Sequence, residues 1–219
     1  MQRFCLIILR GRFLRWRGTS RFSCSPARHG DHFSRSIFEL ADKRRNVTYV
    51  LSDDIWTRQV PEELLGRTTF LGPGEDTRLL DGAGEPLDIE AFKSTDEGVA
   101  FLVKAEGKVI YHAGDLNNWV WEGEPEKDNQ RMSERYHTEL AKLAGRHIDV
   151  AFMLIDPRQE KDFYLGMDDF MRTVGADVVF PMHFWGDFEA ASRFKALPCA
   201  RDYQDRIREI HKKGESFIV

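Results

Sequence analysis

Cysteine is scarce in this 219-residue chain, which has only Cys5, Cys24 and Cys199. The three show no pairing pattern, so the sequence argues against a disulfide framework and favours a reducing compartment. Long apolar runs are missing as well. The first such run, residues 4–9, is shorter than the core of a secretory signal, and no later run approaches the length of a membrane span. We therefore expect a soluble protein in the cytoplasm.

Acidic residues are absent from positions 1–30, which hold seven arginines. Of the 32 basic residues in the chain, the other 25 stand against all 36 acidic ones, and the formal net charge is only −4. The total therefore indicates neither a nucleic acid nor a membrane surface as a partner. The basic opening by itself leaves two alternatives, an organellar transit peptide or a nucleic-acid-binding segment. We favour neither.

Hydrophobic residues make up 42% of the chain, which is long enough to bury a sizeable core. Past residue 35, strand and helix signals alternate without a repeat or a linker, and this predicts an α/β domain. The predicted strands are 46–52, 149–156, 176–184 and 216–219, with a two-strand hairpin over 97–115. The predicted helices are 128–145, 167–175 and one near 201–213.

Three short segments, each near the end of a predicted strand or loop, present histidine and aspartate side chains. They are His29, Asp31 and His32 in "HGDH", His112 and Asp115 in "YHAGD", and His183 in "FPMHF". Strand ends are where functional side chains gather, because the sheet positions them while loops leave room for a substrate. Imidazole with carboxylate suits Zn, Fe or Mn, and the lack of cysteine argues against a structural thiolate site.

Each segment taken alone has a plainer interpretation. The "HGDH" segment fits a polar surface turn, and His112 fits a packed histidine at the end of a strand. Asp115 fits a turn or helix-cap aspartate, and His183 fits a hydrogen-bonded core histidine. Only the order and the setting of the three segments together favour a metal site.

The stretches "HGDH", "STDEGVAFLV", "YHAGDLNNW" and "FPMHFWGD" resemble the metallo-β-lactamase-fold hydrolases, particularly their small bacterial and archaeal members. The resemblance covers residues 29–219. It implies an αββα sandwich with one or two metal ions at a sheet edge, Zn²⁺ ahead of Fe or Mn. In this family a metal-bound hydroxide attacks an ester, lactone, amide or phosphodiester bond of a small-molecule substrate, because a bound divalent ion lowers the pKa of water to about 7.

The resemblance assigns one metal pocket in full. Asp31 and His32 would bind the first ion, His183 would complete its pocket, and Asp115 would bridge two ions. Asp31 or Asp115 would also manage the proton during catalysis. The implied enzyme is a metal-dependent hydrolase.

The second pocket departs from the family pattern. His29 matches one of its two leading histidines, but Ala27 stands where the other is expected. A further histidine is also missing, and Asp96 is the nearest candidate to replace it. We therefore predict at most one tightly held ion. The alternative function is a metal-binding but catalytically inactive protein, a pseudoenzyme or truncated product, and restoring a histidine at position 27 would distinguish the two.

Residues near these motifs have supporting roles in this interpretation. Asp156 follows the strand predicted over 149–156 and would orient a metal ligand through a hydrogen bond, as His112 would. Trp119 and Trp121 would line a substrate pocket or pack against a neighbouring loop. Arg158 would meet an anionic substrate or lie in solvent.

The N-terminal segment also departs from the family, whose members place more sheet before the signature than the 28 residues found here. Residues 1–28 are rich in arginine and lack strand alternation. We therefore expect the fold to lack its first strands, and residues 1–28 to be an atypical basic segment, mistranslated or disordered, before a domain over 29–219. The alternative is a genuine, divergent N-terminus.

Overall fold

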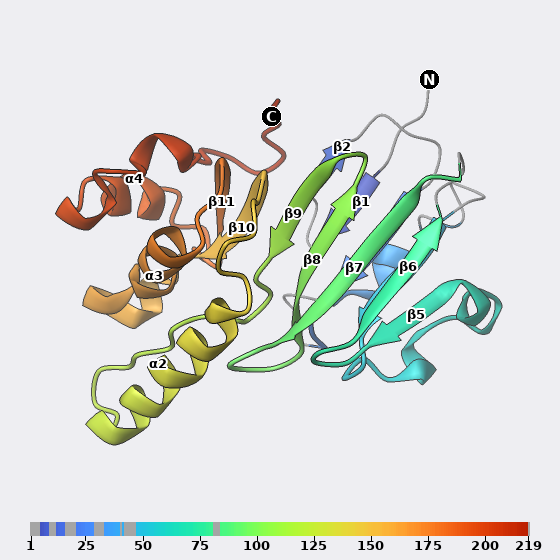
Figure 1. Cartoon of the computed structure of the whole chain (residues 1–219), viewed down its shortest axis with the longest axis horizontal. Coiled ribbons are helices and arrows are strands. Elements are labelled where there is room, and N and C mark those ends of the chain that lie inside the picture. Colours follow the sequence, from blue (N-terminus) through green and yellow to red (C-terminus); the bar gives the residue numbers. More distant parts are fainter. Residues whose placement is uncertain are drawn as a thin grey trace. The chain divides into compact units, whose positions relative to one another are not determined.

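The computed structural model describes residues 5–8, 12–15, 21–28, 33–39, 41, 47–80 and 84–218. The chain divides into two units (Figure 1). Unit 1 consists of Met1–Lys93 and Glu97–Gly107, and unit 2 consists of Ser94–Asp96 and Lys108–Val219. The boundary predicted between residues 28 and 29 stays a prediction.

A five-stranded sheet forms one part of unit 1, in the order β2-β1-β3-β4-β5. The strands are β1 Cys5–Ile8, β2 Arg12–Arg15, β3 Arg21–Ser25, β4 Val47–Ser52 and β5 Thr68–Leu71. Strands β1 and β2 are antiparallel, and the other neighbours are parallel. The expectation that the first strands are missing is wrong for these stretches. Strand formation depends on pairing with a neighbour, here β3 on β4, more than on alternation within one segment.

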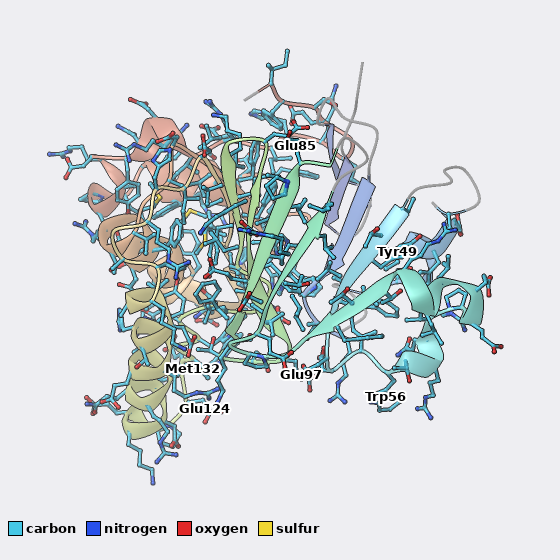
Figure 2. All side chains as sticks on the ribbon, turned by 45° about the vertical axis from the view of Figure 1, so that its right-hand side comes forward. Tyr49, Trp56, Glu85, Glu97, Glu124 and Met132 are labelled. Carbon is cyan, nitrogen blue, oxygen red and sulfur yellow. The ribbon has the colours of Figure 1, made fainter. Side chains whose placement is uncertain are left out.

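The core of unit 1 lies against β4, whose position matches the strand predicted over 46–52. Tyr49 on β4 is fully buried and contacts Phe38 edge to face, with 5.0 Å between ring centroids (Figure 2). Three 3₁₀ helices accompany this sheet, η1 Arg35–Phe38, η2 Thr57–Gln59 and η3 Glu62–Arg67. Ile37, Ile55 and Leu64 belong to the same buried cluster. Burial of these apolar side chains stabilises the unit.

Three antiparallel strands complete unit 1: β6 Asp76–Leu80, β7 Pro86–Lys93 and β8 Val99–Ala105. β8 ends at a two-residue turn in which Glu106 and Gly107 have φ values of 51° and 74°. Two successive residues with positive φ are typical of the tight hairpin turn. The turn therefore lies where the sequence predicts it, within 97–115, and β9 begins directly after it.

Unit 2 is built on three parallel strands, β9 Lys108–His112, β10 Val150–Leu154 and β11 Val178–Met182. Their apolar sequences suit strands that are buried on both faces. The helices of unit 2 are α2 Glu126–Ala141, α3 Leu165–Thr173 and α4 Ala190–Lys195. Tyr111 of β9 stacks on Phe170 of α3 with 5.4 Å between ring centroids, so the strands and this helix share one core. The strands predicted over 149–156 and 176–184 and the helices predicted over 128–145 and 167–175 are confirmed.

The last part of the chain differs from the prediction. Instead of a helix over 201–213, it forms two 3₁₀ turns, η5 Pro198–Ala200 and η6 Gln204–Arg206, and Ile207 then makes a parallel bridge to Val179 of β11. Residues 216–218, where a strand is predicted, form none. The open edge of β11 competes with helix formation for this segment. Of the helices in the described ranges, none is both long and apolar enough to cross a membrane.

Candidate metal-binding site

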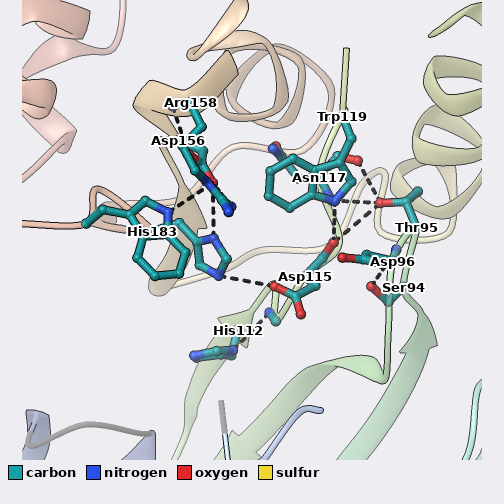
Figure 3. A network of polar contacts seen from close by, with 12 residues as sticks. Ser94, Thr95, Asp96, His112, Asp115, Asn117, Trp119, Asp156, Arg158 and His183 are labelled. Carbon is teal, nitrogen blue, oxygen red and sulfur yellow. Dashed lines mark hydrogen bonds and ion pairs between the residues drawn. The ribbon is translucent and has the colours of Figure 1, made fainter. Parts of the chain in front are cut away.

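The site lies in unit 2, where the three parallel strands end (Figure 3). His112 is the last residue of β9, Asp156 lies two residues beyond β10, and His183 follows β11 directly. Because carboxyl ends of neighbouring parallel strands share one edge of a sheet, residues far apart in the sequence come together there. Asp115, three residues beyond β9, joins them.

His183 lies between two carboxylates. Its Nε2 atom is 3.1 Å from Oδ1 of Asp115, and its Nδ1 atom is 3.3 Å from Oδ2 of Asp156 (Figure 3). The side chain of His183 is 9% exposed, whereas those of Asp115 and Asp156 are 2% and 0% exposed. The structure thus brings together Asp115, His183 and Asp156, three of the residues singled out in the sequence.

Asp115, His183 and Asp156 form a row, and its electrostatics follow from the hydrogen bonds within it. Burial alone would lower the pKa of His183, but the hydrogen bonds and charges of Asp115 and Asp156 outweigh it and raise the pKa to about 9. Burial would raise the pKa of Asp156, yet hydrogen bonds from Arg158 and His183 hold it well below its usual range. The two carboxylates therefore favour positive charge between them.

Asp156 is held by donors from three residues. The guanidinium of Arg158 grips both carboxylate oxygens, with 2.9 Å between Nε and Oδ1, and its backbone N–H donates to Oδ1 at 3.0 Å. The indole Nε1 of Trp185 is 3.3 Å from Oδ2, the same oxygen that faces His183. Asp156 therefore has the position expected of a carboxylate that orients a histidine.

The loop that carries Asp115 is held by buried hydrogen bonds. The indole Nε1 of Trp119 donates to the carbonyl of Asp115 at 3.0 Å, and the hydroxyl of Thr95 donates to the carbonyl of Asn117 at 2.6 Å. The side chain of Asn117 donates to Oε1 of Gln159 at 2.9 Å. Sequence reasoning missed Thr95, Asn117 and Gln159, although the first two lie within the motifs "STDEG" and "AGDLNN".

The turn after β11 has a strained backbone. His183 and Trp185 adopt φ values of 59° and 51°, and Gly186 has a φ of 91°. Positive φ is uncommon for side chains other than glycine, and a bulky tryptophan is among the least suited to it. Such strain costs on the order of 1–3 kcal/mol per residue and concentrates at functional sites.

The remaining predicted residues have different positions. His112 is buried, and its Nδ1 atom accepts the backbone N–H of Gly114 at 3.0 Å. Asp96 is exposed, and its backbone N–H donates to the hydroxyl of Ser94 at 3.2 Å. Trp119 and Trp121 stack with 5.7 Å between ring centroids. The predicted ligands lying outside the described residues are His29, Asp31 and His32.

Ala27 belongs to unit 1, where it is fully buried. It packs on Gly98, because a Cβ placed on that glycine would lie 2.7 Å from the Cβ of Ala27 and 2.0 Å from the carbonyl oxygen of Pro26. The next residue, Arg28, forms two hydrogen bonds with the carboxylate of Glu97. Position 27, where the family has a leading histidine, therefore carries a buried methyl group, and position 28 carries a salt bridge.

A second cluster of ligand types in unit 2 escaped the sequence analysis. Nε2 of His147 lies 3.4 Å from Asp177 and 3.8 Å from Asp149. The ammonium of Lys108, however, is 2.6 Å from Asp149 and already supplies a positive charge. We assign no metal to this cluster.

Comparison with known proteins supports a fold. No family model and no curated protein matches the chain. Among solved structures, CmlA, a diiron β-hydroxylase from Streptomyces venezuelae, has a TM-score of 0.54 at 11% identity over 94% of this chain. YhfI from Bacillus subtilis, described as a metallo-β-lactamase-fold protein, has a TM-score of 0.49 at 11% identity, covering 83% of this chain and 72% of its own. CmlA and this chain share one fold, the metallo-β-lactamase fold.

The metallo-β-lactamase-fold neighbours differ in length and in metal. The chain spans only 49% of the length of CmlA. Zn²⁺-bound PqqB from Methylobacterium extorquens is more distant, with a TM-score of 0.40 at 10% identity over 77% of this chain and 63% of its own. CmlA is described as a diiron protein and PqqB as a Zn²⁺-bound protein.

The described residues fit a metal in part. Two atoms bound to one tetrahedral zinc ion lie about 3.3 Å apart, given bonds of about 2.0–2.1 Å. Nε2 of His183 and Oδ1 of Asp115 are 3.1 Å apart and form a direct hydrogen bond, so an ion bound by both would replace the proton between them. Asp156 on the other ring nitrogen completes the carboxylate–histidine pair that commonly supports a metal ligand. These two side chains can therefore supply two ligands of one ion.

Proposed function

We propose that this chain is a metal-dependent hydrolase that holds a divalent ion, zinc before iron or manganese, through Asp115 and His183. The buried row Asp115–His183–Asp156 is the observation that carries the proposal, since its carboxylates already favour a cation. When bound, such an ion polarises the bond under attack and lowers the pKa of water. The bond is an ester, lactone, amide or phosphodiester of a small molecule.

The chain's own residues have separate roles in this proposal. Asp156 accepts the Nδ1 proton of His183 and thereby selects the tautomer whose Nε2 atom faces Asp115. Asp115, whose loop is held by Trp119 and Thr95, keeps its carboxylate in place and accepts a proton during the reaction. His32 and Asp31 remain the predicted further ligands of the same ion.

Metal content and hydrolysis, measured on the same samples, test the proposal. Metal-stripped protein is reloaded with zinc, its bound zinc is measured by mass spectrometry, and a chromogenic ester, a lactone, an amide and bis(4-nitrophenyl) phosphate are assayed. We expect one tightly bound ion per chain and hydrolysis of at least one bond class, both lost in Asp115→Asn and His183→Ala. His137→Gln is the matched control, because His137 also faces a carboxylate, that of Asp169 at 3.2 Å, but is half-exposed. Equal zinc binding by all variants would contradict the proposal.

A second candidate is a metal-binding protein without hydrolytic activity. The buried methyl of Ala27 favours it, because a methyl group cannot bind a metal in place of the expected histidine. The same experiment separates the candidates. Zinc uptake that depends on Asp115 and His183, with no hydrolysis of any bond class, would support the inactive protein.

A further inference from the structure

We propose that Arg158 and Trp185 form a subsite for organic anions, in which the guanidinium binds a carboxylate and the indole contacts the adjoining apolar group. The inference rests on the proposed function, because it makes carboxylate-bearing molecules the substrate class of that site. Its evidence is that both exposed side chains are hydrogen-bonded to Asp156, a member of the buried row Asp115–His183–Asp156.

Both residues combine exposure with a link to the site. The side chain of Arg158 is 51% exposed, although its partner Asp156 is fully buried. Trp185 is 54% exposed, one of few large apolar residues among those described that face solvent to this extent. Both donate to Oδ2 of Asp156, which also faces His183. A molecule that contacts Arg158 or Trp185 is therefore linked to the imidazole of His183 through the carboxylate of Asp156.

Arg158 is held in a defined orientation. Asp156 grips its guanidinium through two oxygens, and the guanidinium lies over the Trp185 ring at 4.5 Å and over the Trp121 ring at 6.0 Å. An arginine held in this way loses little further entropy when it binds a planar anion. A fixed guanidinium recognises a carboxylate by geometry as well as by charge.

Several aromatic rings pack near the subsite, of which Trp119 is buried and Trp185 is exposed. Trp185 contacts His183 edge to face at 5.6 Å, and Trp119 lies 5.9 Å from His183 and stacks on Trp121. An exposed tryptophan beside a cation offers an apolar surface for the part of the ligand next to its carboxylate. Aryl and alkyl carboxylates have both features, whereas inorganic anions have only the charge.

Arg193 shows what is particular to Arg158. It too is half-exposed, grips a carboxylate through both oxygens, that of Asp187, and lies over an aromatic ring, that of Phe163 at 5.9 Å. Asp187, however, accepts the backbone N–H of Glu189 at 3.2 Å, and its side chain is 35% exposed, whereas Asp156 is fully buried and faces His183. Arg193 is therefore a matched control with the same local chemistry on a different carboxylate.

Binding of phenylacetate and of its neutral analogue phenylacetamide to metal-stripped protein tests the subsite by calorimetry. Removing the metal prevents the carboxylate from binding to an ion. We expect phenylacetate to bind about tenfold more tightly than phenylacetamide, the preference of a charge-assisted hydrogen bond. Arg158→Gln should abolish this preference and Arg193→Gln should keep it. Trp185→Ala should weaken both ligands by a similar factor.

Three results would overturn the inference: equal affinity of the wild type for both ligands, an unchanged preference in Arg158→Gln, or an equal loss in Arg158→Gln and Arg193→Gln. Thermal melting shows whether Arg158→Gln is folded. If it is not, the inference is tested by the preference of the wild type for phenylacetate and by the affinities of Trp185→Ala for both ligands. The readout needs neither metal nor turnover. A failure of hydrolysis in the zinc experiment and a failure of anion binding here are therefore distinguishable.

Discussion

Two sets of residues that the sequence analysis linked to metal binding have opposite environments. In unit 2, Asp115, His183 and Asp156 are buried, charged and hydrogen-bonded to one another. In unit 1, the start of the signature is the methyl of Ala27 packed on Gly98. Buried charges persist only where partners compensate them, whereas a buried methyl needs only close packing. The first set is therefore a network of compensated charges, and the second is a close-packed contact.

The largest expected effect comes from breaking the packing in unit 1. Gly98→Ala places a Cβ 2.0 Å from the carbonyl of Pro26 at a φ of 70°. We expect a loss of about 3 kcal/mol in the free energy of unfolding, from steric overlap together with left-handed strain. Urea denaturation measures it. Gly107→Ala, with φ at 74° and open space around its Cβ, isolates the strain and should cost about 1 kcal/mol. Equal losses would show that the contact with Pro26 is unimportant.

Breaking the row in unit 2 should affect metal binding more than folding. Asp156→Asn keeps the shape of the side chain but removes the charge that faces Nδ1 of His183. We expect zinc affinity to fall about 10–100-fold, the usual cost of losing a partner of a metal ligand. Competition with a chromogenic chelator measures this. Asp187→Asn, on the surface carboxylate that pairs with Arg193, should leave affinity unchanged.

Introducing a histidine at position 27 of unit 1 should not create a metal ligand. Ala27→His places an imidazole where the side chain is fully buried. We expect a loss of about 1–3 kcal/mol in stability from overpacking and no gain in bound zinc. Ala196→His, at an exposed position, is the control and should melt like the wild type. More bound zinc with unchanged melting would refute the view that position 27 is a packing position.

The smallest effect on stability is expected at the Arg28–Glu97 salt bridge. Both side chains are partly exposed, at 46% and 30%. Glu97→Gln should change the melting temperature less than Gly98→Ala, Gly107→Ala or Ala27→His, because exposed ion pairs contribute little. High salt should remove the remaining difference from the wild type, since solvent ions screen the pair. A change as large as that of Gly98→Ala would contradict this.

The fold was predictable where one segment carried its own signal. The apolar runs over 149–156 and 176–184 predict β10 and β11, and the spacing over 128–145 predicts α2. Strands β1 to β3 were missed because their pairing is decided by neighbours, not by their own pattern. The helix predicted near 201–213 failed for a similar reason, since Ile207 bridges to β11.

The candidate site divides in the same way. Asp115, Asp156 and His183 were predictable because each follows a strand, and parallel strands share an edge. The contacts that hold them were not, because Thr95 reaches Asn117 across 22 positions and Gln159 reaches Asn117 across 42. Gly98 packs on Ala27 across a still longer stretch of sequence. Such contacts follow from the folded arrangement, which spacing along the chain does not encode.

A single atom, Oδ2 of Asp156, accepts hydrogen bonds from His183, Arg158 and Trp185. A ligand that binds to one of these three donors changes how strongly the other two interact with Oδ2. If the proposed metal binds the imidazole and the proposed anion binds the guanidinium, the two affinities are linked through this one carboxylate. By thermodynamic reciprocity, whatever factor the anion imposes on metal affinity, the metal imposes on anion affinity.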